Sequence, residues 1–525
     1  MASQIEVEMS LAELVKAPLS QKDFTRQRFR FIDCRALVHK NTFRLLSFAT
    51  LPAEQYSAIS YVWRGLPPLP AGPDDPPEEK KGWIAVEGAL AADPIALRML
   101  RTACRASLQL GHRLLWLDGV CIMQHDGADK AWQIGRMHDV YARCGICLVF
   151  PGGLRRLGGL ADETPWIHRA WTLQEAVAPR RVECVLAWPW GPDVAPQTYF
   201  GIIFQDVEPG TSAMTPLGPL LMGAALGEMQ LKRLRGGSTA SLPATVRLDL
   251  FGRDTQTISA LMRCRNRTNS EESKSAIWNS AILRSASVPV DMVFSIMGLL
   301  GVTLDVASFG GEDVHRATVE LARALLAKGG RANWMSLSFS VEPDPRMSTF
   351  PYFPRVSIDG NTYVETPEGL KKPGDYIFFP VWYLDNALTG SMNEKGYFEF
   401  TAAAAPVWPT DQNSWEKAQD QGDPRCVIKT TRDQYWSLTP PPQSQTDARR
   451  NPGDSHVGSF CIVIGEQQQW TEGSFPRYAK LEVITVMFVS EHMPGKWHVV
   501  GHGEVEPEFV EGWQNRKFVV GGPEA

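Results

Sequence analysis

The segment Arg113-Leu-Leu-Trp-Leu-Asp-Gly-Val-Cys-Ile-Met-Gln-His-Asp126 decides the fold of the first half of this chain. Its apolar run, Leu114 to Leu117, predicts a buried strand, and the acidic side chain of Asp118 follows at the end of that strand. A second segment, Trp166-Ile-His-Arg-Ala-Trp-Thr-Leu-Gln-Glu175, predicts a helix that carries aromatic rings, amides and one carboxylate. Most of the functional side chains that we predict lie in these two segments.

Strands and helices alternate around the first segment, from Tyr56 to Trp188. Apolar, β-branched and aromatic runs predict buried strands at 56–63, 114–117, 145–150 and 182–188. Helical spacing of apolar residues predicts helices over 94–110, 126–143 and 164–176. The expected N-caps of the last two are Asp126 and Thr164, with Pro165 at the first helical position of the last. This alternation predicts a parallel α/β sheet flanked by helices.

The composition divides the whole chain into four parts. Residues 1–50 carry N-terminal strands, paired at 29–32 and 43–46, and the α/β domain occupies residues 51–190. A mainly helical section is predicted at 191–330, with helices over 220–234, 270–286, 289–300 and 313–328. A β-rich C-terminal module is predicted at 331–525, with strands at 376–379, 461–464 and 481–486. Residues 440–452 are polar and rich in Pro, and we expect them to be disordered.

Several classes of protein are excluded by the totals over 525 residues. A net charge of -5 provides no basic surface for nucleic acid or for an anionic membrane. No apolar run approaches the roughly 20 residues that span a bilayer, and residues 1–18 lack the basic start and apolar core of a secretory signal. The nine Cys are scattered among apolar neighbours, as is typical of reduced thiols. We therefore expect a soluble cytoplasmic protein with no nucleic-acid or membrane partner.

Metal and phosphate motifs are weak in this sequence. Cys144 and Cys147 form a lone CxxC without a second pair or a His cluster, so no metal site is predicted. No glycine-rich phosphate loop of the Walker type is present. Arg155 and Arg156 lie between pairs of glycines and could contact a phosphate, although a surface turn is the simpler interpretation.

Four ordered blocks of the sequence resemble the fungal heterokaryon incompatibility domain, called the HET domain. The blocks are Ser60-Tyr-Val-Trp63, Trp116-Leu-Asp-Gly-Val-Cys-Ile-Met-Gln-His-Asp126, the spaced residues Gln133, Met137 and Tyr141, and Arg169-Ala-Trp-Thr-Leu-Gln-Glu175. Their order and spacing resemble the family pattern over residues 56–188. A looser resemblance covers residues 284–298, which include Asp291.

The resemblance implies a role in fungal non-self recognition and in a cell-death response. HET domains also resemble TIR domains, whose α/β fold uses a helix-borne Glu to hydrolyse NAD. In TIR domains that Glu follows a Trp on the same helix, and Trp171 and Glu175 are similarly arranged, four residues apart on one helix face. By this analogy NAD is a substrate, no cofactor is needed, and Glu175 contacts the ribose or stabilises the cation formed as nicotinamide leaves.

Seven side chains are candidates for the functional site. Glu175 and Asp118 are the catalytic candidates, because apolar neighbours would raise the pKa of Glu175 and because Asp118 closes a strand of the sheet. The candidates for substrate binding are Ser60, Tyr61, Trp63, Gln124 and Trp171.

Most of these candidates also have a structural interpretation. Glu175 could be the ion-pair partner of Arg169 or Arg180, and Asp118 could cap a helix or fix a turn. Aromatic rings such as those of Tyr61 and Trp63 often serve packing, and the polar side chains of Gln124 and Asp126 could fix the loop that follows the strand.

The sequence departs from the HET pattern at three places. Met123 stands where Asn is usual, Arg64 separates Trp63 from Gly65, and Asp129 replaces a common Glu. These departures keep two further functions open. One is a non-catalytic module that self-associates or binds other HET or signalling proteins. The other is a repurposed enzyme on this fold that acts on a small metabolite.

Overall fold

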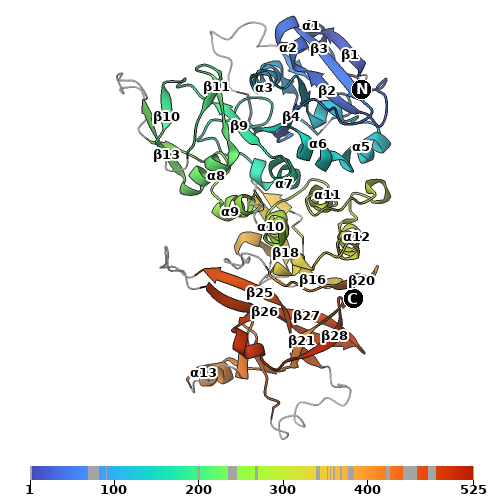
Figure 1. Cartoon of the computed structure of the whole chain (residues 1–525), viewed down its shortest axis with the longest axis vertical. Coiled ribbons are helices and arrows are strands. Elements are labelled where there is room, and N and C mark those ends of the chain that lie inside the picture. Colours follow the sequence, from blue (N-terminus) through green and yellow to red (C-terminus); the bar gives the residue numbers. More distant parts are fainter. Residues whose placement is uncertain are drawn as a thin grey trace. The chain divides into compact units, whose positions relative to one another are not determined.

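The structure of the chain is a computed structural model (Figure 1). It describes residues 3–68, 82–89, 91–197, 201–233, 245–265, 270–337, 343–351, 353–354, 356–358, 361–366, 369–375, 384–420, 426–441, 458–470 and 480–523. The chain forms two compact units. The first contains Met1–Arg265, Ala286–Leu299 and Thr303–Gly311, and the second contains Asn266–Ser285, Leu300–Val302 and Glu312–Ala525.

A nine-stranded sheet forms the centre of the first unit, in the order β1-β3-β2-β7-β4-β8-β9-β12-β11. Its four central strands are parallel: β7 (Leu114–Trp116), β4 (Tyr56–Tyr61), β8 (Ile146–Phe150) and β9 (Val182–Ala187). The strands β7, β4 and β8 are buried along their whole length, as expected when helices cover both faces of a sheet. The predicted parallel α/β sheet flanked by helices is confirmed.

Antiparallel strands extend this sheet on both sides. On one side lie β2 (Phe29–Asp33), which pairs with β7, then β3 (Thr42–Phe48) and β1 (Gln4–Ser10). On the other side β9 is followed by β12 (Ser212–Pro216) and β11 (Gln205–Glu208). Helix α2 (Cys34–Lys40) connects β2 to β3. The N-terminal strands therefore belong to the same sheet as the α/β region, which the sequence did not indicate.

Helices cover both faces of the parallel strands (Figure 1). Connections between parallel strands are right-handed, so α3 (Leu97–Gln109), which leads from β4 to β7, lies on one face. The connections from β7 to β8 and from β8 to β9 cross the sheet in the opposite direction. The helices of these connections therefore lie on the other face: α4 (Asp118–Cys121), α5 (Gly127–Ile134), α6 (Met137–Arg143) and α7 (Ala170–Val177).

The predicted helix starts have different outcomes. Asp126 is the N-cap of α5, because its side chain accepts hydrogen bonds from two backbone N–H groups of the first turn. Thr164 is not a cap, since its hydroxyl group donates to the carbonyl oxygen of Leu250 over 2.6 Å. A 3₁₀ turn at Trp166–His168 follows, and α7 begins only after it. The helix predicted over 126–143 is two helices, with Gly135 at the end of the first.

Shorter elements complete the first unit. They are α1 (Leu11–Leu14), β5 (Trp83–Ile84), β6 (Ile95–Ala96), β10 (Val194–Pro196), α8 (Leu217–Leu226), β13 (Glu228–Arg233), β14 (Thr245–Arg247), α9 (Thr255–Arg265), α11 (Asp291–Met297) and a 3₁₀ turn at Val306–Ser308. The helix predicted over 220–234 is wrong in its second half. Gly227, with a φ of 79°, ends α8, and the alternating burial of the next six residues is that of a strand.

The second unit contains helices and many short strands. The helices are α10 (Ser270–Ile282), α12 (Val314–Ala327) and α13 (Gln412–Asp420), with 3₁₀ turns at Asn333–Ser336, Pro373–Asp375 and Pro507–Val510. The short strands are β15 (Pro343–Asp344), β16 (Met347–Pro351), β17 (Val356–Ile358), β18 (Asn361–Thr366), β19 (Gly369–Lys371), β20 (Gly390–Met392), β22 (Trp408–Thr410), β23 (Val427–Lys429) and β24 (Tyr435–Ser437).

Five longer strands of the second unit close into a ring. They are β21 (Phe398–Pro406), β25 (Ser459–Trp470), β26 (Lys480–Met493), β27 (Lys496–Val505) and β28 (Gln514–Val520). The ring closes because β28 pairs both with β27 and with β21. The predicted β-rich C-terminal region is confirmed. The strand predicted at 376–379 and, from residue 442 onward, the disorder predicted at 440–452 lie outside the described residues.

Gly65 allows two loops of the first unit to approach closely. A Cβ atom at this position would overlap the backbone of Gly152 and Gly153. The backbone N–H of Leu66 donates to the carbonyl oxygen of Gly152 over 2.8 Å and fixes this approach. The preceding Arg64 is exposed and donates to a backbone carbonyl over 3.2 Å, so its inserted side chain does not disturb the contact.

We expect Gly65→Ala to lower the free energy of unfolding of the first unit by about 1–3 kcal/mol, because the backbone must move to admit the methyl group. Urea unfolding followed by circular dichroism measures this change. Gly218→Ala in α8 is the control, since a Cβ atom there meets no atom within 4 Å. Equal midpoints for the two variants would show that the loop approach is not tight.

Candidate functional site

The carboxyl end of β4 lies at a switch point of the parallel sheet. The helix that follows β4 lies on one face, and the helices that follow its two neighbours, β7 and β8, lie on the other. In open α/β sheets, ligands bind outside the carboxyl ends of the strands at such points. Ser60 and Tyr61 are the last residues of β4, and Asp118 follows β7 by two residues. The strand order therefore brings candidates from two separate motifs to one position.

The carboxyl group of Glu175 is buried beside Ser60. Only 6% of Glu175 is exposed, and the hydroxyl group of Ser60 donates to its Oε2 over 2.5 Å. Ser60 has no exposed surface and accepts a hydrogen bond from the indole N–H of Trp166 over 2.9 Å. Burial raises the pKa of Glu175 to about 8, although the hydrogen bond from Ser60 lowers it. Glu175 is therefore mostly protonated at neutral pH.

Asp118 is the second carboxyl group of the site. The indole N–H of Trp63 donates to its Oδ2 over 2.8 Å, and the backbone N–H of Gly119 donates to its Oδ1 over 2.6 Å. Burial raises the pKa of Asp118, and hydrogen bonds from Trp63, from the Tyr61 hydroxyl and from Gly119 counteract part of that rise. The negative charge of Asp118 also raises the pKa of Glu175, so the two carboxyl groups interact. Interacting carboxyl groups with raised pKa values are typical of acid–base sites.

Arg169 supplies the positive charge near these groups. Its charge lowers the pKa of Asp118, of Glu175 and of a third carboxyl group, Asp291 at the start of α11. Burial raises the pKa of Asp291, which accepts a hydrogen bond from the indole N–H of Trp171 over 3.0 Å. One guanidinium group therefore acts on three carboxyl groups that come from α4, α7 and α11.

Residues 56–161 match the family model described as heterokaryon incompatibility protein (HET). Residues 56–161 are therefore similar to a HET domain, and below this name refers to the region of the nine-stranded sheet that contains them. The matched part begins at β4, ends after β8, and includes five of the seven candidates: Ser60, Tyr61, Trp63, Asp118 and Gln124. Trp171 and Glu175 lie on α7, beyond the end of the match. No curated protein and no solved structure matches the chain.

The candidate residues of the HET domain form separate hydrogen-bonded groups. Ser60 is bonded to Glu175, and both Tyr61 and Trp63 are bonded to Asp118. The side chain of Gln124 donates to the backbone carbonyl oxygen of Asp118 over 3.2 Å and to that of Ile122 over 3.1 Å, which is the loop-fixing arrangement expected for it. The remaining candidate is Trp171 on α7. Its indole N–H donates to the side chain of Asp291 on α11.

Two residues of this site were not among the predicted ones. The hydroxyl group of Tyr141 donates to the carbonyl oxygen of Ile59 over 2.8 Å and also lies within hydrogen-bonding distance of Glu175. The sequence indicated Tyr141 only as one of the spaced residues of the third motif block. Asp291 lies in the looser block at 284–298, and no sequence pattern indicates a specific partner for it.

The HET domain and the rest of the described chain contain no group of His, Cys, Asp and Glu that could hold a metal ion. Cys144 and Cys147 are buried thiols, and burial raises the pKa of Cys144 to about 12. Arg156 pairs with Asp162 over 2.7 Å, as expected of a structural turn. Within the described residues, no helix has the length and apolar character needed to cross a bilayer.

Proposed function

We propose that the HET domain hydrolyses the bond between nicotinamide and ribose in NAD or a related nucleotide, as part of an incompatibility response that leads to cell death. The observation that supports this proposal is the buried pair of Ser60 and Glu175 at the switch point, with Asp118 close enough to shift the pKa of Glu175. Site carboxyl groups of this kind stabilise positive charge that develops on a sugar.

The positive charge of NAD at its nicotinamide ring would change the protonation of Glu175 when NAD binds. The nicotinamide ring of NAD is a cation, and a cation beside a carboxyl group favours its ionised form. Binding therefore releases the proton of Glu175, and the new carboxylate faces the ribose. When the bond between C1′ and the ring nitrogen breaks, its electron pair stays on neutral nicotinamide and the positive charge moves to the ribose. Water then adds to C1′ and loses a proton, which gives ADP-ribose.

Release of nicotinamide by the purified chain tests this proposal. We expect Glu175→Gln to lower the rate by at least about 100-fold, because a neutral amide does not stabilise the ribosyl cation. Glu183→Gln is the matched control: Glu183 is also buried, at 4% exposed, but it pairs with Arg181 on the neighbouring stretch of chain over 3.0 Å. Absence of release from the unchanged protein, or equal rates in the two variants, would refute the assignment.

A second candidate function is a non-catalytic module that self-associates or binds another signalling protein. The complete burial of Ser60 and Trp166 favours it, because a substrate must reach the carboxyl group past these side chains. Under this function Glu175 is only a buried structural carboxyl group. Sedimentation velocity at increasing protein concentration, combined with the nicotinamide assay, distinguishes the two: assembly without turnover supports the module.

A further inference from the structure

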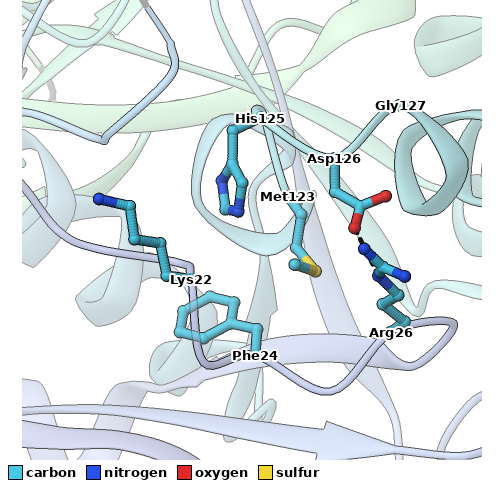
Figure 2. A pocket seen from close by; sticks show the side chains of 7 residues that line it. All are labelled: Lys22, Phe24, Arg26, Met123, His125, Asp126 and Gly127. Carbon is cyan, nitrogen blue, oxygen red and sulfur yellow. Dashed lines mark ion pairs between the residues drawn. The ribbon is translucent and has the colours of Figure 1, made fainter.

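The loop that carries Asp118 packs against an N-terminal part of the chain. We call residues 19–30 the N-terminal segment, and they precede the part of the chain that matches the family model. The loop, residues 117–126, connects β7 to α5. Phe24 from the segment and Met123 from the loop are both buried, and they line the same hollow (Figure 2). The N-terminal segment therefore lies directly on the loop.

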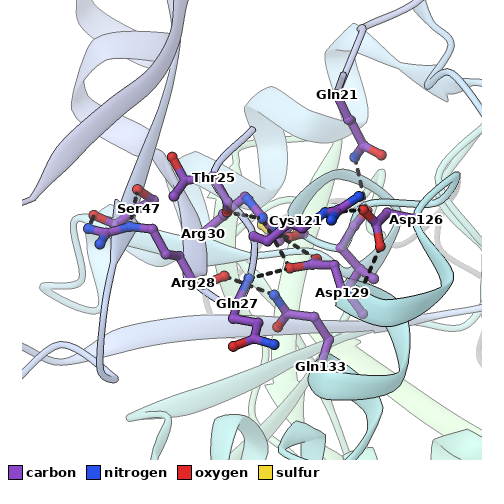
Figure 3. A network of polar contacts seen from close by, with 12 residues as sticks. Gln21, Thr25, Gln27, Arg28, Arg30, Ser47, Cys121, Asp126, Asp129 and Gln133 are labelled. Carbon is purple, nitrogen blue, oxygen red and sulfur yellow. Dashed lines mark hydrogen bonds and ion pairs between the residues drawn. The ribbon is translucent and has the colours of Figure 1, made fainter. Parts of the chain in front are cut away.

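Gln21 is at the centre of this contact (Figure 3). Its side chain has no exposed surface. The amide nitrogen donates to the carbonyl oxygens of Val120 and Ile122, both over 2.9 Å, and the amide oxygen accepts from the backbone N–H of Gln124 over 2.8 Å. Because an amide offers both donors and an acceptor, this one side chain satisfies three backbone groups of the loop.

Arg30 adds a fourth bond from the N-terminal segment to the loop. Its guanidinium group donates to the carbonyl oxygen of Cys121 over 3.0 Å and pairs with Asp129 over 3.1 Å. The carbonyl oxygens of three consecutive loop residues, 120–122, therefore accept hydrogen bonds from the segment. Since a buried carbonyl group without a partner costs free energy, the loop depends on the segment for its conformation.

The same part of the loop holds the backbone of Asp118. The carbonyl oxygen of Asp118 accepts from the backbone N–H of Ile122 over 3.0 Å and from the side chain of Gln124 over 3.2 Å. Ile122 and Gln124 are two of the three residues that Gln21 binds. Gln21 is therefore linked to Asp118 through two different residues.

The carboxyl group of Asp118 has hydrogen bonds of its own. They come from Tyr61 and Trp63, at and after the end of β4, and from the backbone N–H of Gly119. These bonds fix the direction of the carboxyl group, whereas the bonds of the loop fix the backbone that carries it. A displacement of about 1 Å in a site can lower the rate of a reaction by about 100-fold. The position of the loop therefore affects the group around Glu175.

We propose that Gln21 is a positioning residue of the HET domain, which holds the loop so that Asp118 keeps its place relative to Glu175. Gln21 acts through Ile122 and Gln124. It does not contact a substrate, because it is buried and its amide is bonded to the loop. The catalytic consequence rests on the proposed function, and the position of Asp118 does not.

The pKa of Glu175 reports on the position of Asp118. The negative charge of Asp118 raises this pKa, and the effect weakens as the two carboxyl groups move apart. Infrared titration of the full-length chain measures the pKa from the band that Glu175→Gln removes. The other titratable or charged groups that face Glu175 are Tyr61 on β4, Tyr141 on α6, Cys147 on β8 and Arg169 before α7. Burial raises the pKa of these Tyr and Cys side chains, so they stay neutral during the titration.

We expect Gln21→Met to lower the titration midpoint of Glu175 by roughly half a pH unit or more, because the freed loop lets Asp118 move away and admits water. Gln133→Met is the matched control. Gln133 is also buried, at 1% exposed, and its side chain also bonds the N-terminal segment, but through the carbonyl oxygen of Arg28 over 2.8 Å. Its midpoint should equal that of the natural protein. A midpoint in Gln21→Met that equals the control would show that the bonds to the carboxyl group are sufficient, and would overturn the proposal.

A second variant tests the route from Gln21 to Asp118. Gln124→Met removes one side-chain bond to Asp118 and keeps the backbone N–H that Gln21 binds, and it should also lower the midpoint. The shift in the double variant of Gln21 and Gln124 should be smaller than the sum of the two single shifts, since both changes act on the same group. Full additivity would contradict the route. Gln21→Asn, which keeps the amide on a shorter side chain, replaces Gln21→Met if circular dichroism shows that the latter does not fold.

Nicotinamide release provides the catalytic readout. At pH 9 Glu175 is mostly ionised. There we expect kcat of Gln21→Met to fall at least about tenfold with a smaller change in KM, because Gln21 does not contact NAD. Gln133→Met should keep the natural kcat. The infrared titration contains no NAD, so a shifted midpoint without any release supports the positioning role and refutes only the proposed function. An unshifted midpoint in a protein that releases nicotinamide refutes only the role of Gln21.

Discussion

Replacement of Asp129 by Ala is expected to lower the free energy of unfolding of the HET domain by about 3–5 kcal/mol. Asp129 and its partner Arg30 have no exposed side-chain surface, so the variant leaves a guanidinium group buried without a counter-charge. It also removes the acceptor of the backbone N–H of Gln27. This is the largest loss of stability that we expect from a single polar substitution in the chain.

Hydrogen exchange at increasing urea concentration measures the loss in peptides that cover β2 and α5. The double variant Arg30→Met with Asp129→Leu should recover part of it, because two apolar side chains can replace a buried ion pair. Lys517→Met is the control, since the pair between Lys517 and Glu399 is mostly exposed and contributes little. If Asp129→Ala were no more harmful than Lys517→Met, the network of Figure 3 would not hold the N-terminal segment in place.

The sequence predicted local features of this fold well and distant pairings poorly. The four parallel strands and the cap at Asp126 follow from patterns within about ten residues, such as apolar runs and an acid before a helix. The pairing of Arg30 with Asp129 joins residues that are 99 positions apart. The sequence marked Asp129 only as a replacement for a usual Glu, because no local pattern identifies the partner of a buried charge.

In the candidate site, too, the sequence predicted local features better than distant pairings. The end of a parallel strand is a favourable place for a functional side chain, and this rule alone predicts Ser60, Tyr61 and Asp118 from the sequence. The hydrogen bond from Trp171 to Asp291 spans 120 positions and depends on how α11 packs on α7. Sequence spacing placed Trp171 on one helix face with Glu175, but it could not show that its N–H group already has an acceptor.

Glu175→Gln is expected to make the HET domain more stable than the natural sequence at alkaline pH, in addition to its effect on nicotinamide release. The pKa of Glu175 rises from an ordinary value of 4.5 to about 8 on folding, chiefly because the carboxyl group is buried. Between these pH values the folded protein keeps a proton that the unfolded chain has lost. The contribution of Glu175 to the stability of the natural protein therefore falls as pH rises from about 4.5 to about 8, and changes no further above that.

A neutral glutamine removes this pH dependence. We expect the variant and the natural protein to have similar stability at pH 4, and the variant to be more stable at pH 9 by an amount on the order of a few kcal/mol. Urea-dependent hydrogen exchange in peptides that cover β4 and α7 measures the difference at each pH. Glu54→Gln, at an exposed carboxyl group before β4, is the control. The difference in stability between this variant and the natural protein should not change with pH.

The same substitution separates a functional from a merely structural carboxyl group. A buried group that lowers stability at physiological pH persists where activity requires it, so a gain in stability together with a loss of nicotinamide release is the result expected of a catalytic Glu175. At low NAD concentration the rate of release by the natural protein should also rise with pH up to about 8, because the free protein must lose the proton of Glu175 to reach the active form. If Glu175→Gln lowered stability at pH 9, the carboxyl group would be ionised and held by its neighbours in the folded protein. Its role would then be that of a structural ion pair with Arg169.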